Sequence, residues 1–248
     1  MKFSKIILLL AISFILTECK VEDSATEPEP GSPFFYKIAE YQTEVLEPSG
    51  LTLDKNHNYL WTVSDNTNQV YKLNTKGNII KTLDFIGDDL EGISYDHSDN
   101  TLWVAEEQLR ELVHIDTNGN EIARFQITNL EGSGNSGIEG VCVDSSKSFF
   151  VLNEKKPRLW AKLNSNFVAT TIKEITELGD LSGIFCFYNG NFLIVSDESK
   201  KLFEWSPTAG IIASIDLGYS KAEGIAYDKT TGKAYIVSDA TGKLYVYK

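Results

Sequence analysis

Hydrophobic and polar positions follow one pattern that returns five times between Glu47 and Lys248. Each copy opens with a small or acidic residue, a glycine and an apolar residue, passes through a polar turn, and then has an apolar run that ends near an acidic residue. The five openings are Ser49-Gly50-Leu51, Glu91-Gly92-Ile93, Glu139-Gly140-Val141, Ser182-Gly183-Ile184 and Glu223-Gly224-Ile225. Their glycines are 42, 48, 43 and 41 residues apart. Repeats of this length are typical of propellers and solenoids, because one copy cannot bury its own apolar face.

Each copy predicts four short β-strands. The strands are rich in β-branched and aromatic residues and are separated by turn signals such as Asn74-Thr75-Lys76-Gly77. The second strand, as in Leu60-Trp61-Thr62-Val63-Ser64, is apolar at nearly every position, which suits a strand covered on both faces. No stretch of the repeat region has a convincing helical period. The pattern therefore predicts an all-β protein, a five-bladed β-propeller of four-stranded antiparallel blades.

The last copy is one strand short. It predicts strands at Ile225–Asp228, Ala234–Asp239 and Leu244–Tyr247, after which the sequence reaches Lys248. Near the other end, residues Phe34–Glu44 alternate apolar and polar side chains and have no copy of their own. We expect this segment to complete the last blade, because a closed ring leaves no open sheet edge.

The first 18 residues have the pattern of a signal peptide. Lys2 and Lys5 precede the apolar run Ile6–Leu16, which is too short to span a bilayer comfortably. Cys19 follows directly, so Leu16-Thr17-Glu18-Cys19 is similar to the lipobox of a bacterial lipoprotein and predicts lipidation of Cys19, with simple secretion and an uncleaved anchor as alternatives. Residues 19–33 are acidic and contain prolines, as in an extended tether, and residues 34–248 form the propeller. This organisation predicts a lipid-anchored protein of the bacterial cell envelope, facing the periplasm or the cell surface.

The net charge excludes several classes of partner. The chain has a formal charge of −12, and loss of a signal peptide with two lysines and one glutamate leaves the mature chain more acidic. Such a charge disfavours nucleic acid and an electrostatic hold on anionic lipid. The lipid anchor is then the one expected membrane attachment, and a cation is the more natural partner.

Two further cysteines, Cys142 and Cys186, fall in the first strands of successive copies. They stand two and three positions after their respective glycines, so the twofold period of a strand directs them to opposite faces. From this parity we predict that they form no disulfide and pack as small apolar side chains.

The residues before the five glycines define a candidate metal site. In a propeller the first strands surround the axis, so Ser49, Glu91, Glu139, Ser182 and Glu223 are expected to meet at the channel mouth. No lysine or arginine occupies a neighbouring position in these motifs, and the three histidines fall in opposite-face turns, His57 and His97, or in a third strand, His114. Oxygen ligands without histidine or cysteine favour calcium over zinc. We expect calcium at Glu91, Glu139 and Glu223, the alternative being a hydrated acidic mouth with raised carboxyl pKa values.

A wider acidic ring follows the second strands. It consists of Asp65, Glu106 with Glu107, Glu154, Asp197 with Glu198, and Asp239. The loops that begin there also contain basic residues, namely Arg110, Lys155, Lys156, Arg158, Lys200, Lys201 and Lys243. Together with Ser49 and Ser182 this ring could contact an unknown small molecule or a protein at the same face. The alternative is structural, because an aspartate at a strand end often accepts backbone hydrogen bonds of the following turn.

Several motifs in combination resemble the SdiA-regulated family. They are the Glu-Gly-Ile openings, Leu181-Ser182-Gly183, Ser196-Asp197-Glu198-Ser199, and Ala222-Glu223-Gly224 followed by Tyr235-Ile236-Val237-Ser238. The resemblance extends from Glu47 to Lys248 and implies a five-bladed propeller with a calcium site, whose metal role falls by motif position on the three ring glutamates. The chain departs from the family at Asp239-Ala240-Thr241, where the family tends to have glutamate and proline, and in its lipid anchor, where membrane segments are common.

The sequence therefore predicts a calcium-binding recognition module that is held at the cell envelope. The rival hypothesis is a calcium-dependent hydrolase, such as a lactonase, an esterase or a phytase-like enzyme. In that case Glu107 or Glu154 would act as the base and Arg158 would bind an anion. No histidine is expected near the proposed metal, which favours binding over catalysis.

Overall fold

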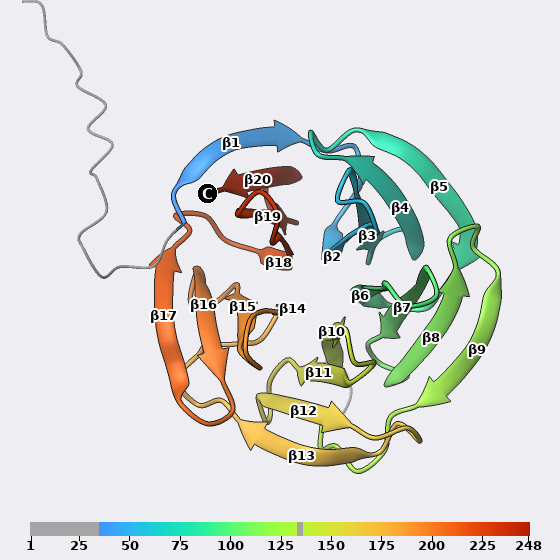
Figure 1. Cartoon of the computed structure of the whole chain (residues 1–248), viewed down its shortest axis with the longest axis vertical. Helices are drawn as coiled ribbons and strands as arrows, with labels where there is room; N and C mark the ends of the chain where they lie inside the picture. Colours follow the sequence, from blue (N-terminus) through green and yellow to red (C-terminus); the bar gives the residue numbers. More distant parts are fainter. Residues whose placement is uncertain (1–34, 133–135) are drawn as a thin grey trace, which may run out of the picture. The chain divides into compact units, whose positions relative to one another are not determined.

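A computed structural model describes residues 35–132 and 136–248, and every helix or strand of this part of the chain is a β-strand. The strands form five sheets of four antiparallel strands, and Figure 1 shows the sheets arranged as blades around a central axis. The predicted five-bladed propeller is thereby confirmed. The predicted signal peptide, Cys19 and the tether lie outside the described residues. Within the described residues, no helix has the length and apolar character that a bilayer crossing requires.

The strands of each blade, A to D, succeed one another from the axis to the rim (Figure 1). The A strands are β2 (Pro48–Leu53), β6 (Leu90–Asp96), β10 (Ile138–Val143), β14 (Gly183–Cys186) and β18 (Ala222–Asp228). The B strands are β3 (Tyr59–Ser64), β7 (Thr101–Glu106), β11 (Phe149–Asn153), β15 (Phe192–Ser196) and β19 (Lys233–Ser238). The C strands are β4 (Gln69–Asn74), β8 (Glu111–Asp116), β12 (Leu159–Leu163), β16 (Lys201–Ser206) and β20 (Lys243–Tyr247). The D strands are β5 (Ile79–Ile86), β9 (Glu121–Gln126), β13 (Ala169–Glu174), β17 (Gly210–Asp216) and β1 (Lys37–Gln42).

Burial decreases from the axis to the rim. All positions of β2, β7 and β15 are buried, whereas β9 and β1 are exposed or half-buried along their whole length. This gradient explains the apolar second strands of the sequence, because a B strand has a neighbouring blade on each face. The D strands have a solvent side, and β1 and β9 alternate exposed and half-buried positions over most of their length.

The hydrophobic core consists of five clusters, and each cluster joins two neighbouring blades. Trp61 of the first blade packs with Ile93 of the second, and Trp160 of the third packs with Phe192 of the fourth. No single blade encloses a core, so the blades depend on one another for burial of their apolar faces. A closed ring therefore supplies each blade with two partners.

The A strands approach one another most closely at their glycines. A Cβ atom added to Gly183 would lie 2.2 Å from the carbonyl oxygen of Glu223 in the next blade. Added to Gly224 it would lie 2.4 Å from the carbonyl oxygen of Ser49, and the corresponding distance from Gly50 to Glu91 is 2.6 Å. Real Cβ atoms do not come this close to backbone, so any other residue would push the blades apart.

Strand β1 closes the ring. It pairs antiparallel with β20, with Lys37 opposite Tyr247 and Gln42 opposite Lys243. The pairing continues beyond the strands, where the Tyr36 and Lys248 backbones exchange two hydrogen bonds of 3.0 Å. The expectation that the segment Phe34–Glu44 completes the last blade is confirmed, and the strand covers Lys37–Gln42 within it.

The prediction that Cys142 and Cys186 remain unbonded is wrong. The structure joins them in a disulfide with a Cα–Cα distance of 5.8 Å. Cys142 lies on β10 and Cys186 on β14, the A strands of neighbouring blades. Two neighbouring blades present opposite faces to each other, so the opposite parity of the two cysteines directs their side chains into the same interface.

Removal of β1 tests how far the ring depends on its closure. We expect deletion of residues 34–44 to abolish cooperative thermal unfolding, because the C strand β20 then becomes an open edge and its blade loses apolar cover. The measurement is melting followed by circular dichroism at 218 nm. Deletion of residues 1–33 is the matched control and should melt as the full chain does. If both truncated chains melted at the same temperature and with the same cooperativity, the stability of the ring would not depend on its closure by β1.

Candidate metal and ligand site at the acidic mouth

The three ring glutamates lie on β-bulges. In β6 the pairing with β7 skips Glu91, in β10 the pairing with β11 skips Glu139, and in β18 the pairing with β19 skips Glu223. A bulged residue has no cross-strand partner, and its side chain is turned out of the regular alternation. The bulge and the following glycine together let each glutamate reach the channel instead of a blade interface.

In four of the five blades, a second contact joins the residue that follows the B strand to the residue that precedes the A strand. The backbone N–H of Glu107 donates to the carbonyl of Asp89 at 2.9 Å, and that of Asp239 donates to the carbonyl of Lys221 at 3.1 Å. The same hydrogen bond joins Asp65 to Glu47 at 3.3 Å and Glu154 to Gly137 at 3.1 Å. In every case the acceptor stands two residues before the ring residue. This repeated bond brings the inner ring and the wider acidic ring to one face.

These residues line one cavity of about 270 Å³, which we call the acidic mouth. Its lining contains nine carboxylates and two lysines, with Ser49 and Ser182 between them: Glu47, Asp65, Glu91, Glu139, Glu154, Lys155, Asp180, Asp197, Lys221, Glu223 and Asp239. The structure thus brings together the three predicted metal ligands, both serines and four of the seven carboxylates of the wider ring. Glu107, another member of that ring, is buried beside Gly137 and lies next to Glu139.

One group of three carboxylates at the mouth lacks a counter-charge. Oxygens of Asp65, Asp89 and Glu91 all lie within 4.8 Å of one another. Among the described residues, Oδ2 of Asp89 is buried without a hydrogen-bond partner, and no lysine or arginine forms an ion pair with any of the three. Sequence reasoning missed Asp89. The available signal was its position two residues before a ring residue, where the copies have Glu47, Asp89, Gly137, Asp180 and Lys221.

A second group consists of Glu107, Glu139 and Glu154, whose oxygens also lie within 4.8 Å of one another. Here two donors reduce the repulsion. The Gly137 N–H donates to Glu107 Oε1 at 2.9 Å, and Lys155 Nζ lies 2.7 Å from Glu154 Oε1. Burial raises the pKa of Glu107 and that of Asp65, and the neighbouring Asp89 raises both further.

A lysine lies on the side of the fifth blade, contrary to the expectation that the ring motifs have no basic neighbour. Lys221 Nζ lies 4.0 Å from Glu223 Oε1 and 3.4 Å from Asp239 Oδ2. Lys221 stands two residues before its ring glutamate, one position beyond the motif that sequence reasoning considered. The mouth is therefore asymmetric: toward the second blade the carboxylates Asp89 and Glu91 form no ion pair with a described lysine or arginine, whereas Lys155 pairs with Glu154 in the third blade and Lys221 lies beside Glu223 and Asp239 in the fifth.

Burial raises the pKa of the ring glutamates. It raises the pKa of Glu91 and of Glu139 well above the usual range, and the neighbouring carboxylates raise both further. Burial also raises the pKa of Glu107 to about 7, although the Gly137 N–H opposes it. For Glu223, burial raises the pKa to about 7 against the opposing charge of Lys221. A bound cation would favour the charged forms, so the site and a divalent ion are electrostatically matched.

Several charged residues of the predicted wider ring and its loops form hydrogen bonds or ion pairs with residues outside the acidic mouth. Arg158 donates to the carbonyls of Ile175 and Gly179, both at 3.1 Å. Arg110 donates to Asn153 Oδ1 at 2.9 Å and to the carbonyl of Leu130 at 3.1 Å. Glu106 is buried and pairs with Arg124. These side chains stabilise loops and blades, so the expectation that Arg158 is free to bind an anion is not supported by its contacts.

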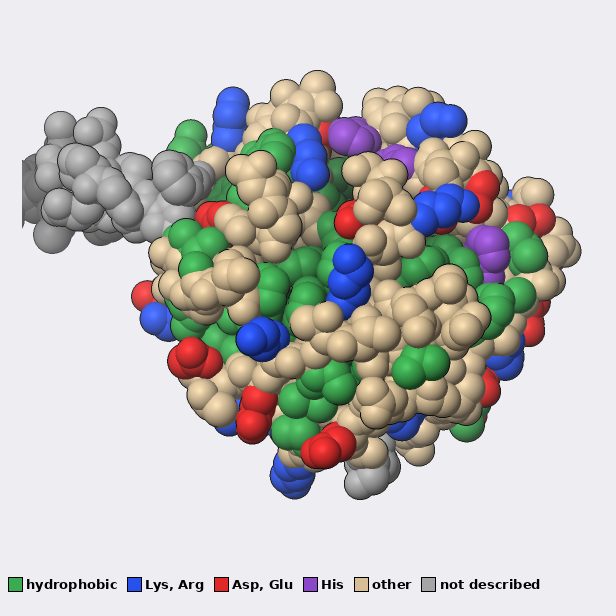
Figure 2. Space-filling model, turned by 60° about the horizontal axis from the view of Figure 1, so that its bottom comes forward, with side chains coloured by type: hydrophobic (Ala, Val, Ile, Leu, Met, Phe, Trp, Pro, Cys, Tyr) green, Lys and Arg blue, Asp and Glu red, His purple; other side chains and the backbone are tan. Residues whose placement is uncertain are grey.

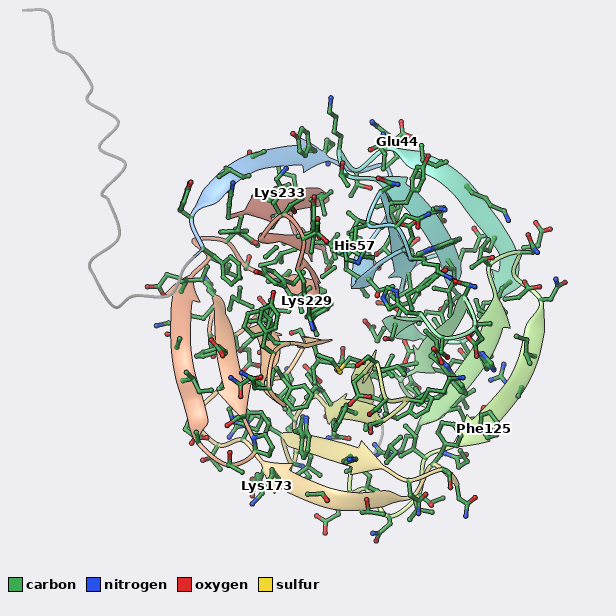
Figure 3. The ribbon with its side chains drawn as sticks, viewed as in Figure 1. Glu44, His57, Phe125, Lys173, Lys229 and Lys233 are labelled. Carbon is green, nitrogen blue, oxygen red and sulfur yellow. A yellow bond between two sulfur atoms is a disulfide. The ribbon has the colours of Figure 1, made fainter. Side chains whose placement is uncertain are left out.

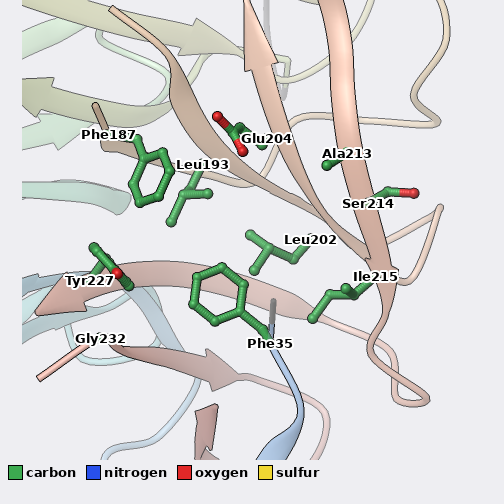
Figure 4. Close-up of a pocket in the computed structure, with 10 residues that line it drawn as sticks. All are labelled: Phe35, Phe187, Leu193, Leu202, Glu204, Ala213, Ser214, Ile215, Tyr227 and Gly232. Carbon is green, nitrogen blue, oxygen red and sulfur yellow. The ribbon is translucent and has the colours of Figure 1, made fainter. Parts of the chain in front are cut away.

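A separate apolar cavity of about 290 Å³ lies between the fourth and fifth blades (Figure 4). Phe35, Phe187, Leu202, Ile215 and Tyr227 line it. Glu204 is the one charged residue of its described lining, and its carboxylate accepts a hydrogen bond from Asn191 Nδ2 at 2.6 Å. The titratable residues of its described lining are Glu204 and Tyr227.

Comparisons with known proteins agree with this architecture. The SdiA-regulated family matches the sequence over residues 35–247. No curated protein matches the sequence. Among solved structures, Myxococcus xanthus glutaminyl cyclase is 13% identical with a TM-score of 0.69, and the match covers 86% of this chain and 95% of that one. A streptogramin B lyase is 11% identical with a TM-score of 0.54, covering 86% and 97%. At these identities the likenesses show the fold alone.

The raised pKa values predict a pH dependence of stability without calcium. A carboxyl whose pKa rises from 4.5 to about 7 on folding stabilises the protein fully below pH 4.5, and this contribution is lost as the pH rises through 7. His97 and His114 have pKa values lowered by burial and act in the opposite direction near pH 6.5. The measurement is therefore the melting temperature of a Glu107→Gln/Glu223→Gln variant minus that of the parent, both in EGTA. This difference should increase by on the order of 5 °C between pH 5 and pH 8, because only the parent loses the contribution of the two carboxyls.

The control is Glu174→Gln, the same substitution at an exposed position of the outer strand β13, and the double variant should show the larger change with pH. A double variant whose difference from the parent is constant would contradict the assignment.

Proposed function

Since this chain belongs to the SdiA-regulated family, we propose that it is an envelope-facing β-propeller that binds calcium at the acidic mouth and uses the same face for recognition. The acidic mouth has a surplus of oxygen donors and no described histidine or cysteine in its lining. Calcium accepts six to eight oxygen ligands and tolerates irregular geometry, which suits donors from several blades.

The observation that carries this proposal is the buried Oδ2 of Asp89, which lacks a hydrogen-bond partner within the described part of the chain and belongs to the group formed with Asp65 and Glu91. A buried carboxylate oxygen without a donor is unfavourable by a few kcal/mol, and a cation removes this penalty. The residues present therefore fit a calcium ion. Glu91 and Asp89 would hold it from the second blade, Asp65 from the first, and Glu139 with Glu107 from the neighbouring group.

The asymmetry of the mouth suggests different roles for the ring residues. Glu223 has Lys221 as a neighbour and needs a cation less than Glu91 or Glu139 does. The carboxylates of the fifth and fourth blades, with Lys221 and Lys155, leave a mixed-charge rim around the proposed ion. We infer that this rim contacts the unknown small molecule or protein that the module recognises.

The rival hypothesis of a calcium-dependent hydrolase has weaker support from the contacts. Glu107, with a pKa of about 7, has the acidity of a general base. The expected anion-binding arginine, Arg158, is instead bonded to backbone carbonyls. Two proteins of similar fold are named as a cyclase and a lyase, but at 13% and 11% identity neither activity transfers to this chain. Binding is the function that the site supports best.

We further propose that Cys19 is lipidated and attaches the propeller to the cell envelope. The Cys142–Cys186 disulfide supports an extracytoplasmic location, because disulfides persist in oxidising compartments. The acidic surface gives no electrostatic hold on anionic lipid, so the attachment would depend on the lipid alone.

Calcium titration tests the proposed site. At a calcium concentration a hundredfold above its dissociation constant, binding stabilises a folded protein by about 2.7 kcal/mol. For a chain of this length this corresponds to a rise in melting temperature of roughly 5–10 °C. We expect Asp89→Asn to remove most of the rise and Glu139→Gln to reduce it, as each removes one charged ligand.

The controls use the same chemistry outside the unpaired groups. Glu174→Gln should keep the full calcium effect, and Glu223→Gln should lose less of it than Glu139→Gln does. Absence of any calcium effect in the parent chain would end the proposal. A full effect in Asp89→Asn together with loss in Glu139→Gln would place the ion in the second group only.

Fractionation of cells tests the anchor. The parent chain should remain with the membrane fraction and show the mass of a diacylated chain that begins at Cys19, whereas Cys19→Ala should be soluble. Ser24→Ala, in the same tether, should behave as the parent. Membrane retention of Cys19→Ala would instead indicate an uncleaved apolar anchor.

A further inference from the structure

The opposite end of the channel has a cavity of its own, of about 530 Å³, which we call the aromatic mouth. It lies where the A strands end and the A–B turns begin. Residues of all five blades line it, among them His57, His97, Tyr188, Tyr227 and Lys229. Figure 3 shows His57 and Lys229 near the centre of the ring, on turns of the first and fifth blades. Figure 2 shows histidine and lysine side chains close together on the surface.

Four blades have an aspartate at the same position at this end. In each of them the aspartate accepts a hydrogen bond from a backbone N–H of the turn that follows it. Asp54 Oδ1 accepts from the Asn58 N–H at 2.8 Å, and Asp144 Oδ1 accepts from the Ser146 N–H at 2.8 Å. Asp96 and Asp228 bind the N–H groups of Ser98 and Thr230 in the same way. The negative charge of this face is thus turned toward backbone donors of the loops.

The fourth blade breaks the repeat. Phe187 occupies the position of the aspartate, because its N–H donates to Asn191 across the turn as the Asp144 N–H donates to Ser148. Tyr188 follows, with 40% of its surface exposed, and its ring lies 4.5 Å from that of Phe187. The ring of Tyr227, in the fifth blade, lies 5.0 Å from that of Phe187 and 6.1 Å from that of Tyr188. One wall of the mouth is therefore aromatic where the other blades have a polar turn.

Lys229 borders this wall and has no acidic partner in the part of the chain that the structure describes. Its ammonium lies 4.8 Å from the centre of the Tyr188 ring and donates to the carbonyl of Phe187 at 3.3 Å. Among the described residues no carboxylate lies within ion-pair distance of Lys229, unlike Lys155 and Lys221 at the acidic mouth. A cation held over aromatic rings and without a counter-ion is a ready partner for an anion.

A fixed imidazole lies across the cavity. His57 Nδ1 lies 2.7 Å from Asp228 Oδ1, which also accepts a hydrogen bond from Thr230. The carboxylate accepts, so Nδ1 donates and the ring is held with its Nε2 edge available for a polar group of a ligand. His57 belongs to the first blade and Asp228 to the fifth, so the contact also joins the two blades that meet at the ring closure.

We propose that the aromatic mouth is a second binding site, for a small anion with a flat aromatic body. Lys229 pairs with the anionic group, the Phe187, Tyr188 and Tyr227 rings contact the flat body, and His57 hydrogen-bonds a further polar group. The volume is within the usual range of small-molecule sites. The two mouths share no lining residue, so this proposal does not rest on the proposed calcium site.

Two fluorescent probes with the same aromatic body test the proposal. 8-Anilinonaphthalene-1-sulfonate has an anionic group, and N-phenyl-1-naphthylamine lacks it. We expect the mature, disulfide-bonded chain to bind one sulfonate probe, and Lys229→Gln to weaken that binding about tenfold, the effect of one charge-assisted hydrogen bond. The neutral probe should bind Lys229→Gln and the parent within twofold of each other. Tyr188→Ala should weaken the binding of both probes, because both have the aromatic body that the ring is proposed to contact.

The matched control is Lys200→Gln, a lysine of a loop between a B and a C strand that does not line the aromatic mouth. It should bind both probes as the parent does, and Lys229→Gln should keep the parent's melting temperature. Unchanged sulfonate binding in Lys229→Gln would overturn the proposal, as expected if the probe occupied the apolar cavity between the fourth and fifth blades. An equal loss of affinity for both probes in Lys229→Gln would overturn it too. The effect of Lys229 would then not come from its charge pairing with the sulfonate group.

Discussion

The structure depends on the close approach of five backbones around one axis. At Gly50, Gly183 and Gly224 the neighbouring A strand leaves no room for a Cβ atom, so the innermost strands contact each other main chain to main chain. This approach sets the radius of the channel and hence the separation of the side chains that line it. It also lets the five interblade clusters close, because a wider hub would separate the apolar faces of adjacent blades.

The same constraint creates the electrostatic problem that defines the acidic mouth. A bulge immediately before the glycine sends Glu91, Glu139 and Glu223 toward the axis, where burial and mutual repulsion raise their pKa values. The fold relieves part of this repulsion with Lys155 and Lys221. The repulsion among Asp65, Asp89 and Glu91 remains, and a divalent cation bound there would offset it.

The two ends of the channel show how a repeat acquires function. The blades have the same strands and nearly the same turns, and chemistry appears where one copy departs from the others. Lys221 replaces an acidic or small residue at one end, and Phe187 replaces an aspartate at the other. A propeller scaffold is compatible with many activities, so these departures say more about this chain than its membership of a fold class does.

The sequence by itself determined the number of blades, the closure by an N-terminal strand and the position of the ring residues. These follow from local signals: a fixed spacing, Glu-Gly pairs such as Glu139-Gly140, and a last copy that lacks one strand. Only the tertiary structure decided how residues of different blades combine. The twofold period of a strand tells which face Cys142 and Cys186 occupy, but not that these faces meet across an interface. In the same way, spacing placed Asp65 and Glu91 at one mouth but could not supply Asp89 as their neighbour or Lys221 as the partner of Glu223. Distances between side chains on separate blades depend on bulges and on the packing of the whole ring, and a linear pattern contains neither.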